Sequence, residues 1–190
     1  MQKVEKAVIG NEQEPRVERR MSDDERQLKL PMLAAWIAAL ATVGTIVLAE
    51  FLPRGDNAYL RGAGVCLLAL AAVFIFAPFF LFRKHGRIED GGSYMQTRTV
   101  VDRGLYSIVR HPQYLGHMLL ACGFALLSQH WLVVVLAVVG ITAIYVQGVE
   151  EERTCRARLG AAYGHYMQRV PRFNIILGVL RVLSRAMQEV

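Results

Sequence analysis

Cysteine is scarce in this sequence, occurring three times in 190 residues. Because three is an odd number, they cannot all pair, and Cys66 and Cys122 lie inside apolar runs whereas Cys155 lies in a polar stretch. Small secreted domains that lack a large core depend instead on dense disulfide bonds. The sequence therefore does not describe a disulfide scaffold, and we expect reduced thiols.

Charged residues are also few, at 20% of the chain against 54% hydrophobic residues. Long stretches carry almost no charge, and runs of about 20 apolar residues are typical of transmembrane helices rather than of soluble domains. The expected spans are residues 30–52, 60–82, 112–128 and 131–149. The sequence therefore predicts an all-α integral membrane protein with about four transmembrane helices.

The N-terminus lacks the short apolar core of a cleavable signal peptide, because the first apolar run begins only at Leu30. Residues 1–29 hold seven basic and seven acidic residues. This composition predicts a solvated or partly helical tail. Residues 30–190 are expected to form a single membrane domain.

The basic residues are distributed unevenly between the expected spans. Seven Lys or Arg precede the first span, two lie in 53–61, six in 83–110, none in the joint before the last span and seven after residue 149. Because cytoplasmic loops collect Lys and Arg, we expect both termini and the 83–110 connection on the cytoplasmic side of a cell inner membrane or its equivalent. The net charge of +6 then has a topological cause. No stacking aromatics are interleaved with the basic residues, so no nucleic-acid partner is expected.

Two cytoplasmic segments have residues suited to chemistry. Residues 98–114 read RTVVDRGLYSIVRHPQY, which also fits a simple interfacial anchor of aromatic and basic side chains. Residues 150–169 begin with three glutamates and place apolar residues at helical spacing. Three carboxylates at a membrane exit are costly unless they are paired with cations such as Arg103, Arg110 and His111. We therefore expect a C-terminal cytoplasmic helix over 150–169 that folds back on 98–114.

Patterns for a bound metal or a soluble nucleotide-binding fold are missing. None of the spacings between the five histidines places two ligands on one helical turn, so no metal is expected. Gly62 and Gly64 open an apolar span without the preceding strand of a dinucleotide-binding motif.

Several short motifs occur in order between Arg98 and Arg172. They are Gly104-Leu105-Tyr106, Arg110-His111-Pro112-Gln113-Tyr114 with Gly116, Glu151-Glu152-Arg153, Leu159-Gly160, Tyr163, Tyr166 and Val170-Pro171-Arg172. In this order and spacing the segment resembles the C-terminal half of the isoprenylcysteine carboxyl methyltransferase and phospholipid methyltransferase superfamily. The first two spans resemble it only in kind. The resemblance implies an integral membrane methyltransferase that moves a methyl group from S-adenosylmethionine to a lipid-borne or amphiphilic acceptor. Its active site would face the cytoplasm, and the C-terminal helix over 150–169 would close the cofactor pocket.

The resemblance also implies roles for individual residues. The cofactor pocket would fall on Arg98, Thr99, Val100, Val101, Tyr106, His111, Pro112, Gln113 and Tyr114. Arg110 or His111 can hold the cofactor's carboxylate or ribose, and tyrosine faces can stabilise its sulfonium. Glu151 would face the acceptor, with Glu152 beside it as a second catalytic candidate. Gln147, one turn before Glu151, would contact the acceptor.

Two departures from the family pattern concern the acceptor. Gln147 stands where the prenylcysteine enzymes place an arginine, and a neutral amide does not hold a carboxylate as arginine does. The tryptophan expected about eight residues after Pro112 is missing. Carboxylate and amine acceptors therefore both stay open. Two other functions also stay open: a membrane reductase using a nicotinamide cofactor, and a non-enzymatic transport or regulatory protein.

Overall fold

The computed structural model describes residues 31–85 and 102–188, and all the regular secondary structure within these ranges is helical. A first helix, Pro31–Phe51, is followed by α2 (Ala58–His85), α3 (Pro112–Ser128), α4 (Trp131–Arg169) and α5 (Ile175–Gln188). A short 3-10 helix, η2 (Gly104–Ser107), precedes α3. The expected spans 30–52, 60–82 and 112–128 thus coincide closely with helices, because each apolar run has no strong helix breaker near its centre.

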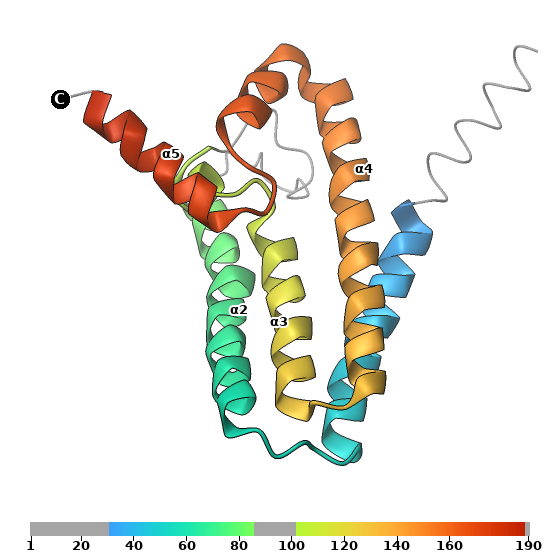
Figure 1. Ribbon diagram of the computed structural model, residues 1–190. Helices are drawn as coiled ribbons and strands as arrows, with labels where there is room; N and C mark the ends of the chain where they lie inside the picture. The colour runs from blue at the N-terminus through green and yellow to red at the C-terminus, as the bar shows by residue number, and fades with distance from the viewer. Residues whose placement is uncertain (1–30, 86–101, 189–190) are drawn as a thin grey trace, which may run out of the picture.

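Four of these helices lie side by side in the order α2, α3, α4, first helix (Figure 1). Three of them, the first helix, α2 and α4, are long and apolar enough to cross a membrane. The 17 residues of α3 are fewer than the roughly 20 that a perpendicular span needs, so its crossing stays a prediction.

Small residues allow these helices to approach closely. On the first helix, the buried residues recur at helical spacing, and they are Ala34, Ala38, Ala41, Thr45 and Ala49. A Cβ added at Gly140 of α4 would lie 3.3 Å from Ala41 Cβ. A Cβ added at Gly116 of α3 would lie 2.9 Å from the backbone nitrogen of Ile75 on α2. Such close backbone packing is typical of membrane helices, where burial of apolar surface gives little drive for association.

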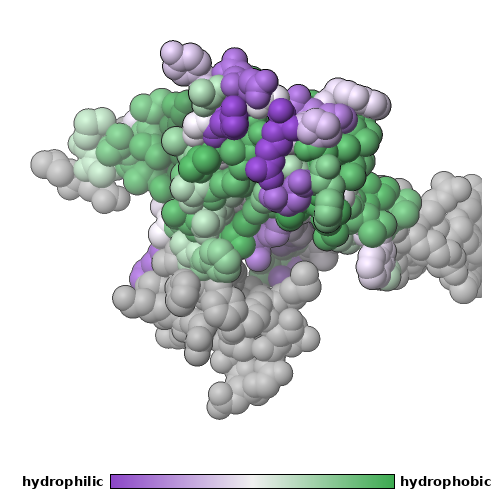
Figure 2. All heavy atoms as spheres, turned by 90° about the horizontal axis from the view of Figure 1, so that it is seen from below, coloured by the Kyte–Doolittle hydropathy of each residue, from purple (hydrophilic) through white to green (hydrophobic). Residues whose placement is uncertain are grey.

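The two short turns at one end of the bundle are joined to each other. The Gln129 side chain accepts from the Asn57 backbone N–H at 3.2 Å and donates to the Asn57 carbonyl at 2.9 Å. The Gly55 N–H donates to the Ser128 carbonyl at 3.0 Å. Seen from this end, hydrophilic residues form a small cluster with hydrophobic flanks around it (Figure 2). The turns therefore fix the spacing of the helices at the end of the bundle opposite the three glutamates, residues 150–152.

The last long helix differs from the expected division into a span ending at 149 and a separate helix from 150. Helix α4 runs without a break through the three glutamates, and its only non-helical residue is Gly160, with φ of 59°. Glycine adopts this conformation without the steric cost that a Cβ imposes. After Gly160 the chain arches back toward η2 (Figure 1).

Candidate functional site

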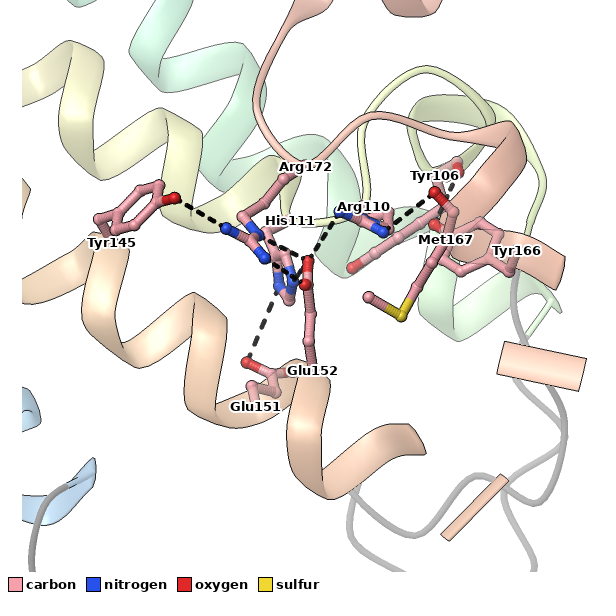
Figure 3. A network of polar contacts seen from close by, with 9 residues as sticks. All are labelled: Tyr106, Arg110, His111, Tyr145, Glu151, Glu152, Tyr166, Met167 and Arg172. Carbon is pink, nitrogen blue, oxygen red and sulfur yellow. Dashed lines mark hydrogen bonds and ion pairs between the residues drawn. The ribbon is translucent and has the colours of Figure 1, made fainter. Parts of the chain in front are cut away.

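Glu152, within the second half of α4, lies at the centre of a buried ionic network (Figure 3). Its side chain is only 3% exposed. Arg172 binds it with two hydrogen bonds, from Nε to Oε1 at 2.9 Å and from Nη2 to Oε2 at 2.6 Å. Arg110 Nη2 lies 3.1 Å from Oε1, and His111 Nε2 lies 3.2 Å from the same oxygen. Three cationic or imidazole groups therefore share one carboxylate.

These contacts join segments that are distant in the sequence. Arg110 also donates from Nη1 to the Met167 carbonyl at 3.1 Å, and its backbone N–H donates to the Pro171 carbonyl at 3.0 Å. The Tyr166 hydroxyl donates to the Tyr106 carbonyl at 2.8 Å. The helical segment after Gly160 is thus bonded to the residues that precede α3.

The apolar face of this returning segment is buried as its spacing predicted. Tyr163, Tyr166 and Val170 form a buried cluster against which Cys155 and Leu159 pack. Burial, and then the charges of its neighbours, raise the pKa of Tyr166 above its ordinary value. Tyr166 is therefore a neutral hydrogen-bond donor that holds the fold-back in place.

Glu151 has a different environment from its neighbour. Its side chain is 41% exposed, and Oε2 lies 3.9 Å from His111 Nδ1. Burial first, and then the negative charge of Glu151, raise the pKa of Tyr106. Tyr114 is also close enough to Glu151 for its hydroxyl to interact with this carboxylate. An accessible carboxylate is thus bordered by a histidine and two tyrosines.

Aromatic rings line the same region. The His111 ring stacks on Tyr114, with centroids 5.5 Å apart and an interplanar angle of 11°. Phe173 lies 5.8 Å from His111 and 6.0 Å from Tyr145 between ring centroids. Arg172 sits 5.3 Å above the Tyr145 ring and donates to its hydroxyl at 3.0 Å. A cationic group can bind against the faces of such rings.

The pKa of Glu152 predicts a loss of stability in acid. Burial alone would raise this pKa, but hydrogen bonds from His111 and Arg172 and the charges of Arg110 and Arg172 lower it from 4.5 to about 2. The ionised carboxylate therefore stabilises the fold fully above the unfolded pKa, and this contribution, roughly 3 kcal/mol, is lost as pH falls through the folded pKa. Thermal unfolding of the wild type and of Glu152→Gln in lipid nanodiscs should give Tm values that converge toward pH 2. A difference in Tm that is constant with pH would contradict this.

The predicted site residues are brought together in part. Tyr106, Arg110, His111 and Tyr114 lie together around Glu151 and Glu152 of α4. Pro112 is buried at the first position of α3, and Gln113 is exposed there. Gln147 lies on α4, one turn before Glu151. Arg98, Thr99, Val100 and Val101 lie outside the described residues. Among the described residues, Arg103 is exposed and makes no ion pair with the glutamates, although it was expected to be available to them.

Sequence reasoning gave no role to Arg172, Tyr145 or Phe173. The one available signal was the charge of three adjacent glutamates, which needs several cations, whereas the 98–114 motif beside them holds three arginines, of which Arg103 does not pair with them. Arg172 supplies the missing cation from 20 residues further along the chain.

The donor set of this site suits S-adenosylmethionine. Arg110 Nε is buried and has no hydrogen-bond partner within the described residues. It therefore has an unused donor for a carboxylate or ribose oxygen. The neighbouring aromatic rings offer faces for a sulfonium.

Residues 60–160, which are more than half of the chain, match a family model described as phospholipid methyltransferase. The matched range covers nearly all of α2, all of α3 and α4 as far as Gly160, and so includes both Glu151 and Glu152. It begins earlier than the resemblance read from the motifs and ends before Tyr163 and Arg172. No curated protein and no solved structure matches the chain.

Proposed function

The chain belongs to the phospholipid methyltransferase family, and we propose that it transfers a methyl group from S-adenosylmethionine to a lipid-borne or amphiphilic acceptor. The observation that supports this proposal most strongly is that two adjacent glutamates have different environments. Glu152 is buried in the ionic network, and Glu151 is partly exposed beside aromatic rings. The bound cofactor would supply an electrophilic methyl group. The protein then has to bring the acceptor atom close and in line, which contributes much of the rate.

We assign separate tasks to the residues around Glu151. Arg110 and His111 would hold polar groups of the cofactor, and Tyr106 and Tyr114 would face its sulfonium. Glu151 would orient the acceptor and accept its proton. Glu152 would act on the reaction only through Arg110, His111 and Arg172, whose positions it fixes.

The charges around Glu151 favour an amine as the acceptor rather than a carboxylate. The two arginines closest to the site, Arg110 and Arg172, are already paired with Glu152, and we assign the one unused donor of Arg110, its Nε, to the cofactor. Gln147, one turn before Glu151, is neutral. A carboxylate acceptor would therefore meet the exposed Glu151 without a free cation to offset the repulsion, whereas an ammonium group gains an ion pair. An amphiphile with an amine headgroup fits this arrangement best.

The test uses purified protein in lipid nanodiscs, methyl-labelled S-adenosylmethionine and a membrane lipid extract. We expect a labelled lipid whose label survives mild alkali, because N-methyl groups are stable where methyl esters release methanol. Alkali-labile product would keep the methyltransferase and overturn the amine acceptor. Binding of a nicotinamide cofactor instead of S-adenosylmethionine would identify a reductase, and binding of neither would identify a non-enzymatic protein.

We further propose that the site faces the cytoplasm. The support is the bias in Lys and Arg, with two in the 53–61 connection and six in the 83–110 connection. In a cysteine-free background, Asp56→Cys should react with an impermeant thiol reagent added to intact cells. Gln168→Cys should react only after the cells are opened. The reverse pattern would invert the topology.

His111→Ala is predicted to weaken cofactor binding. Loss of a hydrogen bond to a charged group costs about 1 to 3 kcal/mol, which is roughly 5- to 150-fold in Kd. Calorimetry with S-adenosylhomocysteine measures this directly. His117→Ala is the matched control, because His117 lies further along α3 and bonds the Gln113 carbonyl. Equal losses in the two variants would show that His111 has no specific role in cofactor binding.

A further inference from the structure

Helix α5 (Ile175–Gln188) was not predicted from the sequence, and it has two unlike faces. One face carries large apolar residues that are 38% to 75% exposed, namely Ile176, Leu177, Val179, Leu180, Leu183 and Met187. Residues 176, 180, 183 and 187 follow the helical spacing of four and three, so they form one continuous stripe. This stripe has no partner within the described residues.

The opposite face of α5 is docked on the protein. Gly178 lies directly against the Ile108 carbonyl, so that no side chain fits at this position. Arg181 donates from Nη1 to the Gln168 carbonyl at 3.1 Å. Arg185 donates from Nη2 to the Ser107 carbonyl at 3.4 Å. These contacts fix the rotation of α5 about its axis and turn the apolar stripe away from the protein.

The start of α5 lies at the depth where the apolar spans end. Phe173 packs on Gly148, near the end of the apolar part of α4, with its Cζ 3.1 Å from the position of a Cβ there. Ile175 packs against the cluster of Phe74, Val109 and Leu115, which joins α2 to the first turns of α3. The start of α5 is therefore held against the bundle at the level where the apolar part of α4 ends.

The stripe faces the side on which the spans lie. Viewed from the end with the two short turns, the arm that projects beyond the bundle toward the C-terminal residues is largely hydrophobic (Figure 2). In Figure 1 this arm is α5. Its residues include two arginines and no acid.

We propose that α5 lies in the plane of the membrane interface, with its apolar stripe inserted between the lipids of the leaflet next to the site. The docking of its opposite face on the protein, the level at which α5 begins and the direction of its exposed apolar stripe all match a lipid surface. The stripe is too small to bind a second copy of the chain. A helix of 14 residues is about 20 Å long and about 10 Å wide, or about 200 Å², where a stable interface needs about 800 Å² per partner.

This arrangement links the membrane surface to the site. Arg185 and Gly178 contact Ser107 and Ile108, which lie three and two residues before the Arg110 of the ionic network. The lipid interface would thus hold α5, and α5 would hold the segment that carries Arg110. This inference does not depend on methyl transfer.

The experiment places an environment-sensitive fluorophore on Leu183→Cys in the full chain, with Cys66, Cys122 and Cys155 replaced by alanine. The protein is held in nanodiscs of phosphatidylcholine and phosphatidylglycerol, with or without phosphatidylcholine carrying a nitroxide at carbon 5 of the acyl chain. Interfacial helices insert about 5 to 10 Å, which is the depth this nitroxide reports. Gln168→Cys is the control, since Gln168 is exposed beside α5 but off the stripe.

We expect blue-shifted emission and strong nitroxide quenching at position 183, with little quenching by aqueous iodide, and the reverse at position 168. Iodide quenching at position 183 equal to that at position 168 would overturn the proposal. So would protection of position 183 from both quenchers together with disulfide cross-linking of Leu183→Cys between copies, which would identify a second copy as the partner. Because all readouts are spectroscopic, this proposal can fail while the methyltransferase proposal stands.

Discussion

Glu152→Gln is expected to lower the free energy of unfolding by about 3 to 5 kcal/mol, the usual cost of removing one partner of a buried ion pair. The amide has nearly the same size but no charge, so Arg110, whose side chain is 9% exposed, would be left buried without a counterion. Arg172 is 25% exposed and can turn toward water, which limits the loss to that range. Thermal and denaturant unfolding in lipid nanodiscs measure the effect.

Glu150→Gln is the matched control, two residues earlier on the same helix. Glu150 pairs with Arg153 at 2.7 Å, but Arg153 is 72% exposed, so water can replace this contact. Surface pairs of this kind contribute about 0 to 1 kcal/mol. Equal destabilisation by the two substitutions would mean that the ionic network around Glu152 does not hold the fold-back in place.

The helix positions were predictable from the sequence because a helix that crosses a membrane needs about 20 consecutive, mostly apolar residues. The first helix spans Pro31–Phe51 where the apolar run gave 30–52, and α3 has the predicted bounds of 112 and 128. A bend within a helix, or a short helix such as α5, leaves no comparable apolar run in the sequence. The bend at Gly160 depends on one backbone conformation, and nothing in the glycine itself distinguishes it from Gly164 four residues later, which has no positive φ.

The site was predictable as far as local motifs extend. The adjacency of Arg110 and His111 and the need of the glutamates for cations pointed correctly to contact between these segments. The motif could not decide which glutamate would be buried. That choice follows from the helical phase of α4, which turns Glu152 toward Arg110 and Arg172 and leaves Glu151 41% exposed. Helical phase becomes informative only when the neighbouring segments are in place.

Glu151→Gln is expected to abolish most of the turnover while it leaves the fold and the cofactor affinity intact. An amide keeps the size of the side chain and its hydrogen bonding, but it cannot accept a proton or attract an ammonium group. Loss of a general base costs about 100- to 10,000-fold in rate. Methyl-transfer rates with the lipid extract measure kcat, and calorimetry with S-adenosylhomocysteine measures the Kd of the cofactor product.

The controls separate a catalytic role for Glu151 from a structural one. Because its side chain is 41% exposed, Glu151→Gln should change stability by no more than about 0.5 kcal/mol, so its Tm should stay close to that of the wild type while the Tm of Glu152→Gln falls. Glu151→Asp keeps the charge on a shorter side chain and should recover part of the rate. A loss of cofactor affinity in Glu151→Gln equal to that in His111→Ala would place Glu151 in the cofactor pocket. The acceptor would then have to be oriented by another residue, with Gln147 the nearest candidate on the same face of α4.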